Sequence, residues 1–318
     1  MSKKILIVGK TSPIGGVTVH VNRLIQSLDK GNYPFTFIPL SLKKIPVVFW
    51  KIPSHNVIHI HSSRVSFMLL IALYARLFKT KTILTFHAEV KLHSGIKIKL
   101  EKLALKFTDI PIMLNTKSLD YALKLNKNAR QISSFIPPVG KEELPKNIID
   151  KLNDLRNKSK YIFCTNAFKR FTMPDGRDVY GIGKLLKIFS TLPEHGLIIS
   201  DPSGQNLQYH LKTWKKIPPN IYFIDHPHSF YAVLKKSDCM IRATLTDGDS
   251  ISIKEALSLN KNVICSDVVS RPSSCITYAT DNDLELKNRI TNFQYSPPTV
   301  SEKLNGFKDL LELYSDKS

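Results

Sequence analysis

The chain has 318 residues, of which 42% are hydrophobic and 23% charged, and this ordinary globular composition excludes disordered and fibrous proteins. Its 46 lysines and arginines against 26 aspartates and glutamates give a net charge of +20. Residues 1–140 hold 21 basic and 5 acidic residues, so +16 of that charge lies in the first half. This asymmetry indicates contact with a polyanion, such as nucleic acid, an acidic membrane face or phosphorylated substrates. No base-reading motif accompanies the charge, so we do not expect nucleic acid as a partner.

Short apolar runs alternate with amphipathic stretches through the first half of the chain. Strands are expected at residues 4–9, 35–40, 57–61, 82–86 and 110–114. Helices are expected at residues 17–28, 65–79, 96–107 and 116–126. Because strands and helices alternate, the sequence predicts right-handed βαβ units and a parallel sheet.

A stretch rich in proline and charge, residues 137–147, interrupts the alternation and is typical of a linker. Beyond it, strands are expected at residues 161–164, 196–199, 221–224, 239–241 and 263–265, and helices at 182–192, 228–236, 251–259 and 301–314. The sequence therefore predicts an α/β fold with two Rossmann-like domains, residues 1–140 and 141–318. Ligands of such sheets bind at the carboxyl ends of the strands, so residues that follow a strand are the candidates for a site.

The chain shows no export signal and no membrane-spanning segment. The apolar run after Lys4 is shorter than the roughly 7–15 residues of a signal-peptide core. The longest apolar stretch, residues 65–78, falls short of the about 20 residues that a spanning helix needs. The four cysteines lack C-x-x-C spacing and are typical of buried thiols in a reducing compartment. We therefore expect a cytoplasmic protein, with any membrane contact peripheral, at the inner face of the plasma membrane.

Glycines and histidines stand at the strand ends of the first half. Gly15 and Gly16 open a helix, whose N-terminal amides favour an anion, although an ordinary strand-to-helix turn explains them equally well. His59 and His61 share one face of a strand, and His87 ends the next one. Core packing is the main alternative for His59, and it explains His61 as well as a functional role does; a functional role is favoured only for His87. No carboxylate has the spacing of a metal ligand, so we expect no metal.

The most polar strand end runs from Ser237 to Glu255. A strand that ends near Arg242 is followed by a turn rich in Gly, Asp and Ser, and then by a helix for which Ser250 is the expected N-cap. Free amides of that turn can hold a phosphate, while Asp247 and Glu255 can accept hydrogen bonds from sugar hydroxyls. Acidic helix capping with solvent-facing charges is the alternative interpretation.

These residues resemble the signature of the retaining GT-B glycosyltransferases, specifically the large family-4 group that includes enzymes of bacterial polysaccharides. That signature is E-G-F-G-x-x-x-x-E-A followed by a strand of the form P-V-I-A-S-D. This chain has Asp247-Gly-Asp-Ser-Ile-Ser-Ile-Lys-Glu255-Ala and then Val-Ile-Cys-Ser-Asp267. The spacing between the two acids is kept, with Asp in place of the first Glu.

Three further motifs extend the resemblance to nearly the whole chain. Gly15-Gly16-Val17 with His20 is similar to the family's N-terminal glycine loop and the helix after it. Thr85-Phe86-His87 is similar to its T-x-H strand end, and Phe135-Ile136-Pro137-Pro138 to its crossing between domains. The resemblance implies a GT-B fold, in which two Rossmann-like domains face each other across a cleft and a C-terminal helix packs back toward the N-terminal domain.

The resemblance also implies roles for the two domains and for single residues. The N-terminal domain would bind the acceptor and the C-terminal domain the donor nucleotide, without a metal or cofactor. Glu255 would hold the ribose hydroxyls, Asp247 the donor sugar, and His87 the sugar near its anomeric carbon. These three are the expected catalytic residues. The donor diphosphate would contact Gly248, Asp249, Ser250, Ile251, Ser252, Lys169 and Arg170, with Gly15 and Gly16 closing from the other domain.

The family's diphosphate clamp is not matched. It uses an Arg after the first strand of the C-terminal domain and a Lys before a later Gly, whereas here Tyr180 precedes Gly181. Lys169, Arg170 and Arg177 are the alternatives for its replacement.

The expected function is transfer of a sugar, with retention, from a nucleoside diphosphate sugar to a lipid-linked bacterial surface polysaccharide or oligosaccharide. A sugar-nucleotide epimerase of GT-B architecture is one alternative. A non-catalytic GT-B partner subunit is another, suggested by the unmatched clamp.

Residues 91–107 interleave apolar positions with lysines. From residue 96 on, a helix would gather Ile96, Leu100, Leu103 and Phe107 along one side, with lysines at its flank or opposite. A core-packed helix with a solvated basic face is one interpretation. Peripheral docking on an anionic membrane surface is the other, and the charge of the first half favours it.

Overall fold

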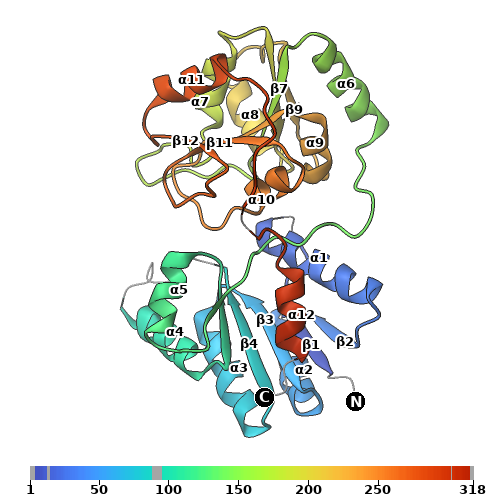
Figure 1. Cartoon of the computed structure of the whole chain (residues 1–318), viewed down its shortest axis with the longest axis vertical. Coiled ribbons are helices and arrows are strands. Elements are labelled where there is room, and N and C mark those ends of the chain that lie inside the picture. The colour runs from blue at the N-terminus through green and yellow to red at the C-terminus, as the bar shows by residue number, and fades with distance from the viewer. Residues whose placement is uncertain (1–3, 13–14, 88–94, 302, 316–318) are drawn as a thin grey trace. The chain divides into compact units, whose positions relative to one another are not determined.

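The computed structural model describes residues 4–12, 15–87, 95–301 and 303–315, and the chain divides into two compact units (Figure 1). Unit 1 comprises Met1–Val139 together with Lys303–Ser318, and unit 2 comprises Gly140–Glu302. The expected second domain ran to residue 318. Its last segment belongs to unit 1 instead, so the chain returns to the first unit at its end.

Unit 1 contains a parallel six-stranded sheet. Its strand order is β2-β1-β3-β4-β5-β6, and every neighbouring pair is parallel. The strands are β1 (Ile5–Gly9), β2 (Phe35–Pro39), β3 (Val57–Ser62), β4 (Lys81–Phe86), β5 (Ile110–Met113) and β6 (Arg130–Gln131). β1 and β3 are buried along their whole length, as a strand with helices on both faces of its sheet must be.

Helices cover both faces of this sheet. One apolar cluster joins inward residues of the strands to α2, α3, α4 and α5, and the cluster on the other face joins them to α1 and α12. The helices are α1 (Gly16–Lys30), α2 (Ile45–Lys51), α3 (Val65–Leu77), α4 (Ile96–Phe107), α5 (Thr116–Leu123) and α12 (Phe307–Ser315), with 3-10 turns η1 (Leu42–Lys44) and η2 (Ile52–Ser54).

The C-terminal helix α12 is part of the unit 1 core. Leu310, Leu313 and Tyr314 pack into the same cluster as β1 and α1. Just before α12, a Cβ atom on Gly306 would lie 2.1 Å from the carbonyl oxygen of Ser133, so only glycine allows this approach. The expectation that the last helix packs on the N-terminal domain is thereby confirmed.

Unit 2 has a second parallel six-stranded sheet, with the order β12-β11-β10-β7-β8-β9. Its strands are β7 (Tyr161–Asn166), β8 (His195–Ser200), β9 (Ile221–Ile224), β10 (Cys239–Arg242), β11 (Asn262–Ser266) and β12 (Ile276–Tyr278). Its helices are α6 (Lys146–Asn157), α7 (Ile182–Phe189), α8 (Gln205–Leu211), α9 (Phe230–Lys236), α10 (Ile251–Ser258) and α11 (Asp283–Thr291). An apolar cluster packs α7 and α11 on this sheet.

Each sheet reverses its strand order once, and these reversals position the candidate sites. In unit 1 the chain builds β2 on one side of β1 and then β3 on the other. In unit 2 it builds β8 and β9 on one side of β7 and then β10 on the other. The carboxyl ends of the strands that flank such a reversal form the ligand-binding crevice of open α/β sheets. The ends of β1 and β3, and of β7 and β10, are therefore the candidate positions for a site.

Candidate functional site

The expected site residues divide between the two units. Gly15, Gly16 and His87 belong to unit 1, and all the others belong to unit 2.

Asp247 lies at the reversal of the unit 2 sheet, between two arginines. Arg242, the last residue of β10, donates from Nε to Asp247 Oδ2 at 3.0 Å and from Nη2 to Oδ1 at 2.9 Å. Arg271 donates from Nη1 to Oδ2 at 2.8 Å. The Gly248 amide donates to Oδ1 at 3.1 Å. These four bonds occupy the about four lone-pair positions that a carboxylate offers.

The electrostatics of this group follow from burial and charge. Burial alone would raise the pKa of Asp247, but the charges and hydrogen bonds of Arg242, and then of Arg271, lower it to about 2. The side chains are 7% exposed for Asp247, 11% for Arg242 and 3% for Arg271. Two guanidinium groups thus share one carboxylate in a recessed position, with a net charge of +1.

The same arginines connect the ends of three strands. Arg242 Nη1 lies 3.3 Å from the side-chain oxygen of Asn166, the last residue of β7. Arg271 Nε donates to the carbonyl oxygen of Ser266, the last residue of β11, at 2.9 Å. The Ser266 hydroxyl in turn donates to the carbonyl oxygen of Thr244 at 2.7 Å. The cluster therefore sits at the carboxyl ends of β7, β10 and β11.

The turn after Asp247 leads into α10 as expected, but with different capping. Ser250 is the N-cap residue, yet its hydroxyl contacts that of Ser252 at 3.0 Å and caps no amide. Asp249 forms an ion pair with Lys254. Glu255 is 5% exposed, so its carboxylate is not one of the solvent-facing charges of the alternative interpretation. Ile251 and Ser252 form the first turn of α10.

The basic residues proposed as clamp alternatives have other partners. The ammonium group of Lys169 lies over the ring of Phe171, 4.6 Å from its centroid, and the Arg170 guanidinium lies 3.6 Å from the centroid of Tyr209. Arg177 pairs with Asp175 and Asp281 and is 54% exposed. All three could still move toward a ligand, but none of them contacts Asp247 in this structure.

Gly181 holds the segment after Arg177 against the end of β10. It has φ +66°, and a Cβ atom there would lie 2.5 Å from the carbonyl oxygen of Ala243. The Asp178 carboxylate then accepts from the amide of Ile182 at 2.7 Å and so caps α7.

In unit 1, four histidines meet at the ends of β3 and β4. The His61 ring lies 4.1 Å from that of His59, 5.0 Å from that of His20 on α1, and 5.4 Å from that of His87, between centroids. His59 Nδ1 lies 2.6 Å from the Tyr314 hydroxyl of α12. We call these four residues the histidine cluster.

Three members of the histidine cluster, His59, His61 and His87, are uncharged. Burial first, and then repulsion by neighbouring imidazoles, holds the pKa values of His59 and His61 well below their ordinary value. Burial and then the proximity of His20 lower the pKa of His87 to about 3. All three rings are therefore neutral near pH 7.

The hydrogen bonds also favour one tautomer for His87. His61 Nδ1 lies 3.2 Å from His87 Nε2, while the buried His61 Nε2 has no hydrogen-bond partner among the described residues. An unpaired buried acceptor costs less than an unpaired buried N–H group. The His61 proton is thus assigned to Nδ1, which donates to His87 Nε2 and leaves the His87 proton on Nδ1.

The glycine loop is only partly described, because residues 13 and 14 lie outside the described residues. The Gly15 amide donates to Thr18 Oγ1 at 2.8 Å, and α1 begins at the exposed Gly16. Through His20, this helix contributes to the histidine cluster.

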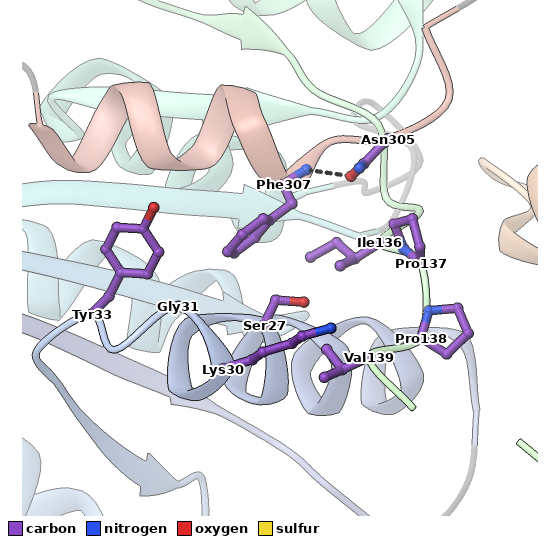
Figure 2. Close-up of a pocket in the computed structure, with 10 residues that line it drawn as sticks. All are labelled: Ser27, Lys30, Gly31, Tyr33, Ile136, Pro137, Pro138, Val139, Asn305 and Phe307. Atoms are coloured by element: carbon purple, nitrogen blue, oxygen red, sulfur yellow. Dashed lines mark hydrogen bonds between the residues drawn. The ribbon is translucent and has the colours of Figure 1, made fainter. Parts of the chain in front are cut away.

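A separate cavity of ≈420 Å³ lies within unit 1, next to the end of α1 (Figure 2). Figure 2 shows Tyr33 and Phe307 on one side of it and the prolines of the interdomain crossing on the other. It is lined by Ser27, Lys30, Gly31, Tyr33, Ile136, Pro137, Pro138, Val139, Asn305 and Phe307. None of the expected site residues lines it.

No helix among the described residues has the length and apolar character to span a bilayer. Within the same residues, no three His, Cys, Asp or Glu side chains are grouped so that they could hold a metal ion.

Solved structures with the same architecture identify the fold. HepE of Anabaena, solved with UDP, superposes with a TM-score of 0.66 at 11% sequence identity, over 98% of this chain and 96% of HepE. Sucrose-phosphate synthase of Thermosynechococcus elongatus matches with a TM-score of 0.63 at 13% identity, over 91% of this chain and 89% of the synthase. The chain has a two-domain GT-B fold.

Epimerases share this fold. UDP-GlcNAc 2-epimerase of Methanocaldococcus jannaschii matches with a TM-score of 0.63 at 12% identity, over 98% of this chain and 99% of the epimerase. No protein-family model and no curated protein matches the sequence. The likeness therefore shows the GT-B fold and leaves the reaction to be argued from the site.

Sequence reasoning missed the two arginines that hold Asp247. Arg242 lies within the segment from Ser237 to Glu255, but the sequence indicates only that a strand ends near it. Arg271 lies 24 residues beyond Asp247, and no spacing rule connects them. Tyr314 of the histidine cluster was missed for the same reason, because its contact with His59 spans 255 residues.

Proposed function

We propose that the protein is a glycosyltransferase that takes its sugar from a nucleoside diphosphate donor held by unit 2. The observation that carries this proposal is the recessed, positively charged Arg242–Asp247–Arg271 group beside the turn and helix that present Glu255, at the reversal of a Rossmann-type sheet. The GT-B neighbours support it, because HepE was also solved with UDP-glucose.

In this mechanism Glu255 accepts hydrogen bonds from the ribose hydroxyls. His87, neutral and with its proton on Nδ1, donates to the donor sugar near the anomeric carbon. The charge that develops on the leaving diphosphate is stabilised by cationic side chains and by the amides of the turn 248–252. Retention follows from attack on the face that the diphosphate leaves. Asp247 is not assigned to the sugar hydroxyls, since its carboxylate is already occupied by four donors.

The experiment is a screen of UDP-, GDP- and other sugar nucleotides for thermal stabilisation, followed by product analysis. A ligand present at about 100 times its dissociation constant adds roughly 2.7 kcal/mol of stability. Release of free sugar or its transfer to an acceptor, with the nucleoside diphosphate as second product, is the expected result. A protein that binds no sugar nucleotide would be the non-catalytic partner subunit instead.

An epimerase is the second candidate, because UDP-GlcNAc 2-epimerases match the chain as well as the synthase does. The same product analysis separates the two. An epimerase converts one sugar nucleotide into another and releases no nucleoside diphosphate at the end of its cycle. We place it second because of the Asp247 and Glu255 spacing.

The proposed acceptor is a lipid-linked saccharide of a bacterial surface polysaccharide, reached at an anionic membrane face. A surface of unit 1 supports this part of the proposal. Helix α4 packs inward through Glu101, Ala104 and Leu105, and of its predicted apolar stripe Phe107 also packs against the core. The rest of the stripe is only partly covered. Ile96 is 73% and Leu103 41% exposed.

Neighbouring helices extend this exposed apolar surface. Trp50 on α2 is 74% exposed and Leu77 at the end of α3 is 76% exposed. α2 touches α3 through the rings of Phe49 and Tyr74, and α3 packs along α4. We call this region the α2–α4 surface. Its exposed lysines include Lys79, Lys97, Lys99, Lys102 and Lys106, and Lys51 is half-buried there. Residues 91–94, the first part of the lysine-rich stretch 91–107, lie outside the described residues.

Vesicle sedimentation tests the membrane contact. We expect sedimentation with anionic vesicles at low salt and release at high salt, because salt screens the attraction. Lys97, Lys99, Lys102 and Lys106 changed together to Gln should weaken sedimentation. The matched control changes four exposed lysines of unit 2, namely Lys212, Lys215, Lys216 and Lys235. Equal effects of the two sets, or equal sedimentation with neutral vesicles, would refute docking by this surface.

A further inference from the structure

We propose that Arg242 and Arg271 form the diphosphate-binding site of unit 2, and that Asp247 is a positioning residue that holds both guanidinium groups in place. This inference rests on the proposed function for the identity of its ligand. It assigns the clamp to two arginines that lie outside the segments where the sequence placed it.

Charge balance is the first argument. Arg242 and Arg271 share the single carboxylate of Asp247, and among the described residues no other carboxylate forms an ion pair with either. Both cations are nearly shielded from water, with side-chain exposures of 11% and 3%. Because two guanidinium groups share one carboxylate, the site lacks one negative charge, and a buried charge without a counter-charge is costly. A diphosphate supplies that charge.

The geometry of the remaining N–H groups is the second argument. Among the described residues, Arg242 Nη1 donates only to oxygens of Asn166, at 3.3 and 3.4 Å. Within the same residues, Arg271 Nη2 donates only to the hydroxyls of Thr244 and Ser266, at 3.4 and 3.5 Å. Charge-assisted bonds from guanidinium to a phosphate oxygen measure about 2.7–2.9 Å. Each arginine therefore keeps one nitrogen that is weakly engaged and can turn to an anion.

The position in the sheet is the third argument. Arg242 ends β10 and contacts the end of β7, and these are the strands on either side of the reversal. The reversal is where doubly wound sheets bind phosphate-bearing ligands. Lys169 and Arg170 lie over aromatic rings, and Arg177 is paired with two aspartates at the surface. Arg242 also lies over a ring, 5.4 Å from the centroid of Tyr180, but it ends β10 at the reversal, and none of the other three ends a strand there.

The fourth argument is rigidity. Asp247 binds Arg242 through two parallel hydrogen bonds and Arg271 through a third. Such a fork fixes the plane of a guanidinium group, which a flexible surface lysine or arginine does not achieve. The site is thus preorganised before the ligand arrives, and the ordering cost of binding falls.

The test is calorimetric titration of the full-length chain with inorganic pyrophosphate, UDP and uridine. We expect pyrophosphate and UDP to bind and the binding to weaken with salt, while uridine binds much more weakly than UDP. Arg271→Gln and Arg242→Gln should each weaken pyrophosphate and UDP binding by at least about tenfold and leave uridine binding unchanged. Arg289→Gln, which removes an exposed arginine of α11 from its pair with Glu285, is the matched control and should bind as the unchanged protein does.

Arg271→Lys and Arg242→Lys keep the charge and provide a second pair of variants if the glutamine changes prevent folding, which thermal unfolding reports. They should bind pyrophosphate with intermediate affinity, because lysine cannot form the same fork. Folded variants with unchanged affinity, or a wild-type chain that binds no pyrophosphate and no UDP, would overturn the inference. Arginine-dependent pyrophosphate binding without any sugar transfer would overturn the proposed function and leave the inference standing. Sugar transfer that is unaffected in Arg271→Gln would overturn the inference and leave the proposed function standing.

Discussion

Acid should destabilise unit 1 through its histidine cluster. His59, His61 and His87 are neutral in the folded chain, since burial lowers their pKa values, and His87 reaches about 3. In the unfolded chain they gain a proton near the ordinary value of 6.5. The folded pKa lies below the unfolded one, so the stabilisation is present above pH 6.5 and is lost as the pH falls. Between pH 6.5 and 5 the neutral His87 costs about 1.6 kcal/mol, and His59 and His61 lower the stability in the same direction.

Hydrogen exchange of the β3 amides, measured between pH 6.5 and 5, reports the opening free energy of unit 1 itself. In His61→Gln one titrating group is gone, so the opening free energy should fall less between these pH values than it does in the unchanged chain. Thr85→Val removes a hydrogen-bond partner of His59 without removing a titrating group, and its effect should not vary with pH. An identical pH dependence in His61→Gln and the unchanged chain would refute the assignment of a neutral, buried cluster.

Glu255→Gln should lower donor turnover by about ten- to a hundredfold without unfolding the chain, because hydrogen bonds to a charged acceptor contribute about 1.5–3 kcal/mol and the neutral amide weakens them. Glu285→Gln on α11 is the control in the kinetic assay. His87 should contribute no titration near pH 6.5 to kcat/KM, since its pKa is about 3, and a limb that disappears in His87→Asn would contradict this. The pKa of Asp247 is about 2 against an ordinary 3.8, which corresponds to about 2.4 kcal/mol of folding stability that is present above pH 3.8 and lost as the pH falls toward 2. Denaturant unfolding of Asp247→Asn at pH 7 should show the loss of this stability. Equal stability of the variant and the unchanged chain at pH 7 would count against the ion-pair geometry. Gly181→Ala should cost about 2 kcal/mol or more, because it combines positive φ with a close carbonyl oxygen, whereas Gly140→Ala, with no atom within 4 Å, should leave thermal unfolding unchanged.

The alternation of strands and helices could be predicted from the sequence because buried parallel strands are continuous apolar runs. All ten expected strands occur, within two or three residues at their ends. The missed strands β6 and β12 are the outermost strands of their sheets, have two and three residues, and carry no apolar run. Helices α2, α6, α8 and α11 were not expected from the sequence. Helix α6 follows the charged linker directly, and few of its residues are apolar. Edge and surface elements depend on tertiary contacts that local pattern does not record.

Only the part of the candidate site that lies within one continuous segment could be predicted from the sequence. The turn and helix from Asp247 to Glu255 stand where the spacing placed them, because strand, turn and helix are consecutive in the chain. The partners of Asp247 and His59 could not be predicted in this way. Arg271 and Tyr314 reach them from distant segments, and only the folded chain brings such residues within hydrogen-bond distance.

Asp247 and Glu255 show why spacing predicts a position better than a role. Both are acids at the spacing of the family signature, and the sequence gives no reason to treat them differently. In the folded chain the Asp247 carboxylate is buried together with two guanidinium groups and forms ion pairs with both. Shortening the first acid of the signature from Glu to Asp leaves the carboxylate close to the backbone, where the Gly248 amide also reaches it. The positive charge that remains after this pairing, rather than the acid itself, is then what the site offers to a ligand.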